Sequence, residues 1–156
     1  MKTIILYATK YGGSAEIAKL IAAHFDEAEI YDLKKGDIPS LEAFDNVITG
    51  SSVYAGSFRN EAKIFLSQNA AQLCKKKLGL FACGMSKGES GEVFRANVPE
   101  DVLKSTTAVC MPGGIFDPAK ANFFEKLIMK IVVKQSGYIN TIDNEKISEF
   151  AEAMKE

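Results

Sequence analysis

The sequence has little of several residue types that build common functional sites. It contains no tryptophan, one histidine (His24) and three cysteines (Cys74, Cys83 and Cys110). The lone histidine has no second histidine with which to share a metal ion. The cysteines are odd in number and far apart, so the sequence predicts neither a disulfide framework nor a zinc site. We interpret them as small buried hydrophobic residues of a protein in the reducing cytoplasm.

Neither sign of charge dominates the sequence. Nineteen basic residues oppose twenty acidic ones, for a formal net charge of −1. A nucleic-acid-binding protein would show a basic stripe, so we expect no nucleic-acid partner. No apolar run approaches the roughly 18 residues that a membrane-spanning helix needs. The segment Met1–Tyr7 has neither the basic region nor the cleavage site of a secretory leader, which again predicts a cytoplasmic location.

The composition is that of an ordinary globular protein, and the apolar residues are distributed periodically. The chain has 156 residues, 47% of them hydrophobic, which fits one domain (1–156) around a single core. Five apolar runs have the length of strands: Ile4–Tyr7, Glu29–Leu33, Asp45–Ser51, Leu78–Cys83 and Thr106–Met111. Three segments have an apolar face at helical spacing: Ile17–Phe25, Phe58–Leu73 and, after an N-cap at Asp143, Ile147–Met154. Strands that alternate with helices predict a doubly wound α/β sandwich around a parallel sheet.

Two segments do not follow this alternation. Met85–Asn97 carries glycines among charges and predicts a surface loop or a broken helix, while Gly113–Asn140 is a long irregular stretch. Inside the second segment, Phe123–Lys134 has apolar residues on more than half of its helical circumference and a lysine at every fourth position. One interpretation is a basic amphipathic helix that contacts a membrane surface or a quinone-reducing partner. The other, which we favour, is a core or dimer helix with one lysine-lined edge.

The loop after the first strand has the residues of a phosphate site. In doubly wound sheets, ligands bind at the carboxyl ends of the strands. The sequence Thr9-Lys10-Tyr11-Gly12-Gly13-Ser14 closes a strand and opens a helix. Its glycines permit a tight turn that gathers N–H groups, and the helix N-terminus and two hydroxyl groups add to the attraction for phosphate. The spacing matches neither a P-loop nor a dinucleotide fingerprint. An ordinary strand-to-helix turn with a serine N-cap explains the loop equally well.

The loop after the third strand, Gly50–Phe58, suits a flat ring. Small hydroxyl residues at the strand end are followed by Tyr54 and then by Gly56. The Tyr54 ring can stack on a planar ligand, and the backbone near Gly56 can approach the edge of that ligand. The alternative, usual for a lone aromatic residue in a loop, is that Tyr54 and Phe58 pack against the next helix.

Together the two loops resemble those of flavodoxins. Thr9–Ser14 is similar to the loop that binds the FMN phosphate in that family, and Gly50–Gly56 is similar to the first ring-binding loop. The resemblance covers nearly the whole chain and implies a flavodoxin-like three-layer α/β/α sandwich, with a five-stranded parallel sheet in the order 2-1-3-4-5. A closer resemblance is to the menaquinone-dependent protoporphyrinogen dehydrogenases of the flavodoxin-like family. It is carried by Val47–Phe65, Gly113–Phe116 and Phe123–Gly137.

The resemblance implies that FMN is the cofactor and assigns three groups of residues to it. The group around the phosphate is Thr9, Lys10, Tyr11, Gly12, Gly13 and Ser14. The group along the isoalloxazine is Ser51, Ser52, Val53, Tyr54, Ala55 and Gly56. The group near the other side of the ring is Cys83, Gly84, Met85 and Ser86. The cofactor carries the chemistry and the protein sets its binding and orientation, so no residue is predicted to be catalytic.

Three features separate this sequence from the electron-carrier flavodoxins that it resembles. Tyr11 stands where those proteins usually have a small hydroxyl residue. Without any tryptophan, and with no tyrosine in Met85–Phe94, the second stacking aromatic of many flavodoxins is missing unless Phe94 replaces it. Shuttle flavodoxins are strongly acidic, which favours basic partners, whereas this chain is nearly neutral. These differences favour an oxidoreductase-like relative.

Three hypotheses for the function remain. The first is an FMN-binding protein of electron transfer or oxidoreduction, with a redox protein or a quinone as partner. The second is protoporphyrinogen dehydrogenation, in which a reduced tetrapyrrole supplies electrons to menaquinone. The third is a binding module without a redox role. A phospho-receiver domain would need acidic residues after the first and third strands, where this sequence has Ala8-Thr9 and Gly50-Ser51.

Overall fold

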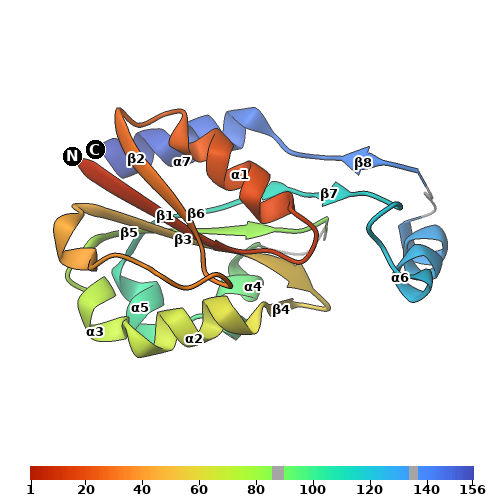
Figure 1. Cartoon of the computed structure of the whole chain (residues 1–156), viewed down its shortest axis with the longest axis horizontal. Helices are drawn as coiled ribbons and strands as arrows, with labels where there is room; N and C mark the ends of the chain where they lie inside the picture. Colours follow the sequence, from red (N-terminus) through yellow and green to blue (C-terminus); the bar gives the residue numbers. More distant parts are fainter. Residues whose placement is uncertain (86–89, 134–136) are drawn as a thin grey trace.

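The apolar runs form a central parallel sheet, which the computed structural model describes together with its helices over residues 1–85, 90–133 and 137–156 (Figure 1). The strands of the parallel sheet are β1 (Lys2–Ala8), β2 (Glu27–Asp32), β3 (Asn46–Tyr54), β5 (Lys77–Cys83) and β6 (Thr106–Gly113). Their order is β2-β1-β3-β5-β6, and the short β4 (Ser57–Phe58) pairs antiparallel with β3. The predicted sandwich and the predicted order of five parallel strands are confirmed, with β5 and β6 as the fourth and fifth.

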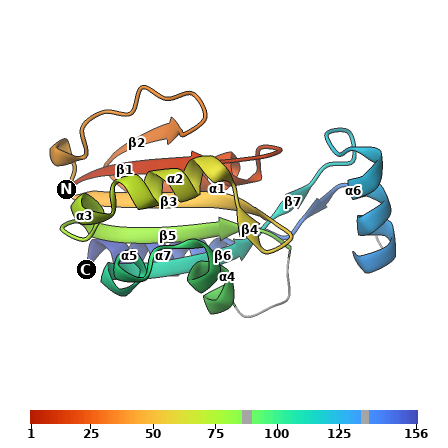
Figure 2. The same cartoon turned by 90° about the horizontal axis from the view of Figure 1, so that it is seen from below.

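Helices cover both faces of this sheet (Figures 1 and 2). One face carries α1 (Gly13–Ala22) and α7 (Asn144–Lys155), and the other carries α2 (Asn60–Gln68), α3 (Ala70–Leu73), α4 (Ser90–Asn97) and α5 (Glu100–Ser105). A single 3₁₀ turn, η1 (Leu41–Ala43), precedes β3. Because neighbouring strand residues point to opposite faces, Ile5 packs against α1 and α7, whereas Ile4 and Leu6 join the core under α2 to α5.

The helices agree with the sequence pattern in kind and differ in extent. The N-cap predicted at Asp143 is confirmed, because its side chain accepts hydrogen bonds from the first turn of α7. The predicted helix Ile17–Phe25 ends earlier, at Ala22. The predicted helix Phe58–Leu73 is interrupted at Asn69, whose side-chain amide donates to the Phe65 carbonyl at 2.9 Å. Phe58 itself belongs to β4.

The two irregular segments contain more regular structure than their sequences indicate. Part of Met85–Asn97 is the helix α4, which buries Phe94 in the core. The long segment after β6 forms a two-stranded ribbon of β7 (Ile115–Phe116) and β8 (Ile139–Asn140). Between them lie α6 (Phe123–Ile128) and the π-helical η2 (Met129–Val133). We call Ile115–Asn140 the insert, and Figure 2 shows α6 at the outer end of its ribbon. No helix in the described ranges is long and apolar enough to cross a membrane.

Candidate functional site

The parallel register brings the predicted loops to one edge of the sheet. Ala8 at the end of β1 pairs with Ser51 of β3, and Ser52 pairs with Cys83 at the end of β5. The loop after β1, the end of β3 and the end of β5 are therefore neighbours, although they are far apart in the sequence. This edge is where ligands of doubly wound sheets bind.

The loop Thr9–Ser14 has the geometry of an anion cradle. Gly12 has a φ of 97°, in the left-handed region that favours glycine, and its N–H donates to Thr9 Oγ1 at 2.8 Å. Helix α1 begins at the next residue, so its first N–H groups have no acceptor within the helix and point toward the loop. A Cβ atom on Gly13 would lie 2.7 Å from Cys83 Sγ, so this close approach requires glycine.

Three hydroxyl groups from two loops meet at the start of α1. Ser14 Oγ and Ser52 Oγ are 2.9 Å apart, and Ser52 Oγ lies 3.5 Å from Thr9 Oγ1. The Lys10 N–H also donates to Ser52 Oγ at 3.3 Å. Ser14 is fully buried, so its hydroxyl lies inside the protein at the base of the loop and not on the outer surface. Hydroxyl donors beside a helix N-terminus fit the phosphate of a nucleotide.

The predicted ring-binding loop is a β-hairpin. Strand β3 extends to Tyr54, beyond the predicted end at Ser51, and the hairpin turns at Ala55 and Gly56, with φ values of 50° and 76°. Two consecutive positive φ values are typical of the type I′ turn, which suits the twist of paired strands. Tyr54 stands at the turn with 47% of its surface exposed, so its ring is available to a ligand.

Asn97 at the end of α4 holds this hairpin in place. Its side-chain amide donates to the Gly56 carbonyl at 2.8 Å, and its side-chain oxygen accepts from the Phe58 N–H at 2.9 Å. The β3–β4 hairpin is thus fixed to α4, in the helical layer on that face of the sheet.

Two predicted residues of the hairpin, Ser51 and Val53, have side chains that contact the protein interior: Ser51 is buried and Val53 is half-buried. The Ser51 hydroxyl donates to the Ser52 carbonyl and accepts from the Arg59 N–H, each at 2.9 Å. Val53 is half-buried and packs against the core and beside Gly84. Both side chains therefore stabilise the loop.

The residues after β5 form the back of the site. The Cys83 thiol is buried beneath Gly13, and burial raises its pKa to about 11, so it remains protonated at neutral pH. The Gly84 N–H donates to the Gly113 carbonyl at 3.0 Å, which joins this segment to the end of β6, just before the insert. Met85 is half-buried. Ser86, the last predicted site residue, lies outside the described residues.

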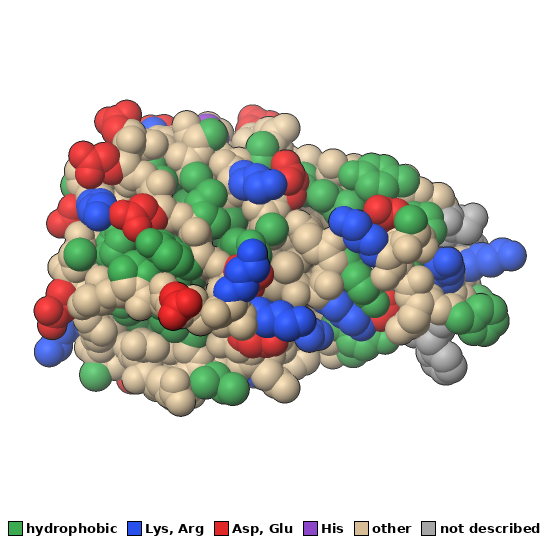
Figure 3. Space-filling view, in the orientation of Figure 1, with side chains coloured by type: hydrophobic (Ala, Val, Ile, Leu, Met, Phe, Trp, Pro, Cys, Tyr) green, Lys and Arg blue, Asp and Glu red, His purple; other side chains and the backbone are tan. Residues whose placement is uncertain are grey.

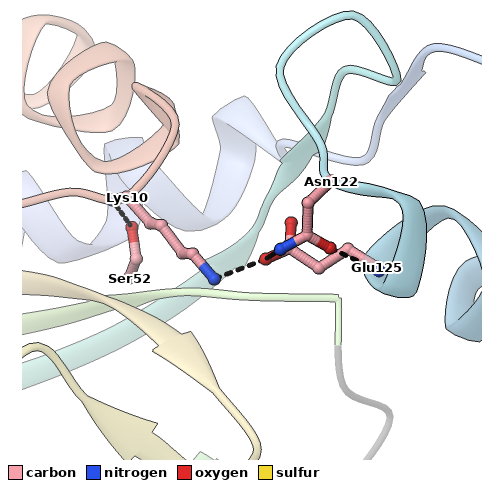
Figure 4. A network of polar contacts seen from close by, with 4 residues as sticks. All are labelled: Lys10, Ser52, Asn122 and Glu125. Atoms are coloured by element: carbon pink, nitrogen blue, oxygen red, sulfur yellow. Dashed lines mark hydrogen bonds and ion pairs between the residues drawn. The ribbon is translucent and has the colours of Figure 1, made fainter.

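The insert contributes Glu125 to the site, a carboxylate that was not predicted from the sequence. Lys10 Nζ forms an ion pair with Glu125 of α6 (Figure 4). The same Nζ lies 4.2 Å from the centre of the Tyr54 ring. Glu125 is only 6% exposed. The N-cap residue of α6, Asn122, donates to Glu125 Oε1 at 3.2 Å and accepts from the Glu125 N–H at 2.8 Å.

The electrostatics of this cluster favour the charged forms. The hydrogen bond to Glu125 raises the pKa of Lys10. Burial alone would raise the pKa of the Glu125 carboxyl, but hydrogen bonds from Lys10 and Tyr11 outweigh it and hold the pKa below its ordinary value. Burial, together with the bond to Glu125, raises the pKa of the Tyr11 phenol. At neutral pH the cluster is therefore an ammonium, a carboxylate and a neutral phenol.

Sequence reasoning missed Glu125 and Asn97 for different reasons. Glu125 is 115 positions from Lys10, and nothing in its own segment distinguishes it from the other charges of an amphipathic helix. Its only local signal is the Asn122 N-cap three residues earlier. Asn97 lies at the end of a helix that was expected to be irregular.

Comparisons with known proteins agree with this architecture. Protoporphyrinogen IX dehydrogenase [quinone] of Escherichia coli is 20% identical over 148 residues, which cover 88% of this chain and 81% of that protein. The FMN-bound flavodoxin of Fusobacterium nucleatum superposes with a TM-score of 0.54 at 21% identity, over 99% of this chain and 96% of the flavodoxin.

A larger protein also contains this fold. Rubredoxin oxygen:oxidoreductase of Desulfovibrio gigas superposes with a TM-score of 0.62 at 16% identity. The match covers 99% of this chain but only 36% of that one, so the two share a domain fold and not a whole protein. The chain also matches the flavodoxin domain family over residues 4–142. Because that match covers most of its length, this chain belongs to the flavodoxin domain family.

Proposed function

We propose that this protein binds FMN at the carboxyl edge of its sheet and takes part in electron transfer or oxidoreduction, in one- or two-electron steps. The observation that carries the proposal is the convergence of the Thr9, Ser14 and Ser52 hydroxyls with the left-handed Gly12 at the start of α1. This donor set fits a phosphate. Membership of the flavodoxin domain family and the likeness to an FMN-bound flavodoxin support FMN as the ligand.

The proposed site has three parts. Thr9–Ser14 binds the phosphate through N–H and hydroxyl donors. Ser51–Gly56 contacts the ring, with Tyr54 as the exposed aromatic residue and the Gly56 backbone beside the ring edge. Cys83–Ser86 borders the other side, and in its described part the buried Cys83 thiol supports the phosphate loop from behind. When bound, the cofactor supplies the redox chemistry, while these residues bind it, orient it and exclude water.

The absorption spectrum tests the proposal most simply. Purified protein incubated with FMN and then desalted should retain the two visible flavin bands. Gly12→Asp should lose them, because it adds a carboxylate beside the phosphate position and a side chain at positive φ. Gly36→Asp is the matched control, since Gly36 also has a positive φ (71°) but nothing lies near its Cβ position. A wild-type protein that stays colourless would leave the third hypothesis, a binding module without a redox role.

The second candidate function is protoporphyrinogen dehydrogenation with a quinone as acceptor. It is favoured by the similarity to the Escherichia coli dehydrogenase and by the insert beside the site, which gives a larger ligand an additional wall. The test is anaerobic turnover of protoporphyrinogen with a menaquinone analogue. Porphyrin fluorescence above that of free FMN supports this candidate, and its absence from FMN-loaded protein excludes it.

The insert also offers a surface for a partner. Phe123, Leu127 and Ile131 lie four residues apart and are 79%, 41% and 66% exposed, and Lys126 and Lys130 are exposed beside them. The exposed apolar row does not fit a core helix, and it supports either a dimer contact or, through the lysines beside it, contact of 123–134 with an anionic membrane surface. Lys134 lies outside the described residues. Sedimentation with anionic vesicles at low salt tests the contact, and Phe123→Ser/Ile131→Ser should remain in the supernatant.

The proposal also includes the extent of the domain and the location of the protein in the cell. We propose that residues 1–156 act as one domain. We also propose a cytoplasmic location, which the three free cysteines support because a reducing compartment keeps thiols unpaired. Mass spectrometry of thiols labelled before lysis distinguishes this location from an oxidising one.

A further inference from the structure

Glu125 is unusual among the charged residues of this protein. In the described part of the chain it is the only charged residue that is buried, and burial of an ionised group requires a partner. That partner is Lys10, the one charged residue of the phosphate loop. Of the ion pairs among described residues, this is also the only one that joins the insert to the rest of the molecule.

The position of Lys10 matters because its ammonium group lies between the two parts of the proposed flavin site. Its backbone N–H donates to Ser52 Oγ within the hydroxyl cluster, while its ammonium pairs with the Glu125 carboxylate (Figure 4). The ammonium also lies 4.2 Å from the centre of the Tyr54 ring. Lysine side chains are flexible, so the location of this charge depends on what holds it. Glu125, itself fixed by Asn122, holds the ammonium over Tyr54.

The charge balance of the site therefore depends on the insert. Lysine and arginine side chains are frequent around the middle of the face in Figure 3 and over the insert, while acidic ones gather at the end with the termini. Glu125 neutralises Lys10, the one cation that belongs to the phosphate loop itself, while Lys120 Nζ lies 3.8 Å from the Cβ position of Gly12. A bound anion would gain less from Lys10 when Glu125 is ionised than when it is neutral.

We propose that Glu125 is a positioning residue of the flavin site: it holds Lys10 over Tyr54 and neutralises it, so that the insert sets how strongly the site attracts an anionic flavin. This inference rests on the proposed function. The phosphate gives FMN a negative charge that riboflavin lacks, so Glu125 lowers the preference of the site for FMN over riboflavin. It also lowers the reduction potential of the bound flavin, because reduction adds negative charge beside the pair.

The test is the ratio of the riboflavin to the FMN dissociation constant at low salt. Glu125→Gln keeps the shape of residue 125 and one oxygen that can accept from Lys10, but removes the charge, and should raise the ratio about tenfold, as expected for one unit of charge at short range. Lys10→Met should lower the ratio by a similar factor. The double variant restores the net charge and should return the ratio to within about threefold of wild type. All differences should shrink as salt is added.

A matched control and a second measurement distinguish an electrostatic effect of Glu125 on the flavin from a purely structural role of this residue. Glu100→Gln makes the same change in total charge at an exposed ion pair with Lys104 and should leave the ratio unchanged. The reduction potential of bound FMN should rise in Glu125→Gln, which a loosened insert alone does not predict. An unchanged or lowered ratio in a folded Glu125→Gln would overturn the inference. Wild-type protein that binds neither flavin would overturn the proposed function instead.

Discussion

The sheet and the insert are stabilised by different kinds of interaction. The sheet buries apolar side chains on both faces, and Ile4, Ile5, Leu6, Val47 and Ile48 have no exposed surface. The insert leaves Phe123 and Ile131 exposed and is joined to the loop Thr9–Ser14 by the Lys10–Glu125 ion pair. Apolar burial hardly changes with pH or a single charge, whereas an ion pair does. We call the part of the chain outside the insert the body. The stability of the body should hardly change when a single charge is removed, whereas the attachment of the insert should depend on it.

The largest effect should come from overpacking the sheet. A Cβ atom on Gly50 would lie 2.1 Å from the Phe81 ring, which is fully buried. Gly50→Ala should therefore lower the free energy of unfolding by about 3 kcal/mol or more. Urea unfolding followed by circular dichroism measures this loss. Gly137→Ala, in open space on the insert, should change the free energy by less than about 1 kcal/mol. Equal losses would mean that the insert is packed as tightly as the sheet.

A local effect should follow from breaking the ion pair. Lys10→Met leaves the buried Glu125 carboxylate without its cation, which costs about 1–3 kcal/mol. The loss should appear as local opening, with amide exchange in α6 faster by about tenfold or more and exchange in β3 and β5 unchanged. Hydrogen-exchange mass spectrometry distinguishes the two regions. Uniformly faster exchange would contradict the division into body and insert.

The pH dependence of the same pair has a definite sign. The folded-state pKa of Glu125 is lower than its ordinary value of 4.5, so its contribution is fully present above that pH and is lost as the pH falls through the folded-state pKa. The pKa of Lys10 is raised, so that contribution persists to pH values above 10.5. Wild type and Glu125→Gln, compared by exchange in α6, should differ at pH 7 and converge below pH 4.5. A constant difference would assign the stabilisation to packing.

The smallest effect concerns the reactivity of the three cysteine thiols, which all lie outside the insert and therefore report on the packing of the rest of the protein. Cys83 and Cys110 are buried, and burial raises their pKa values to about 11 and about 12, whereas Cys74 is exposed. At pH 8 a thiol reagent should modify Cys74 rapidly and the other two only after denaturation. Peptide mapping of the labelled protein checks this order. Rapid labelling of Cys83 would show that the wall behind the phosphate loop opens.

The same division explains what could be predicted from the sequence. The continuous apolar run Ile4–Tyr7 and the Asp143 cap are local patterns, and both led to the correct elements. The hairpin at Ala55–Gly56 was predicted only as a loop, because alanine at positive φ carries no sequence signal. The Lys10–Glu125 pair depends on how a long insert folds back, which no spacing encodes. The buried position of Ser51 depends on the register of β3 with β5, and the half-buried position of Val53 depends on its pairing with β4.

The proposal that FMN binds at the carboxyl edge of the sheet is tested most directly by locating the flavin on the protein in solution. Amide chemical shifts of labelled protein, followed by NMR as FMN is added, report which backbone groups meet the ligand. If FMN binds at the carboxyl edge of the sheet, the largest changes should occur in Thr9–Ser14 and Ser52–Gly56, with smaller ones around Glu125. A cavity of about 460 Å³, bordered by Leu33, Leu41 and Phe65, offers a different position on the molecule. Changes confined to that cavity, with the loops after β1 and β3 unaffected, would contradict the account.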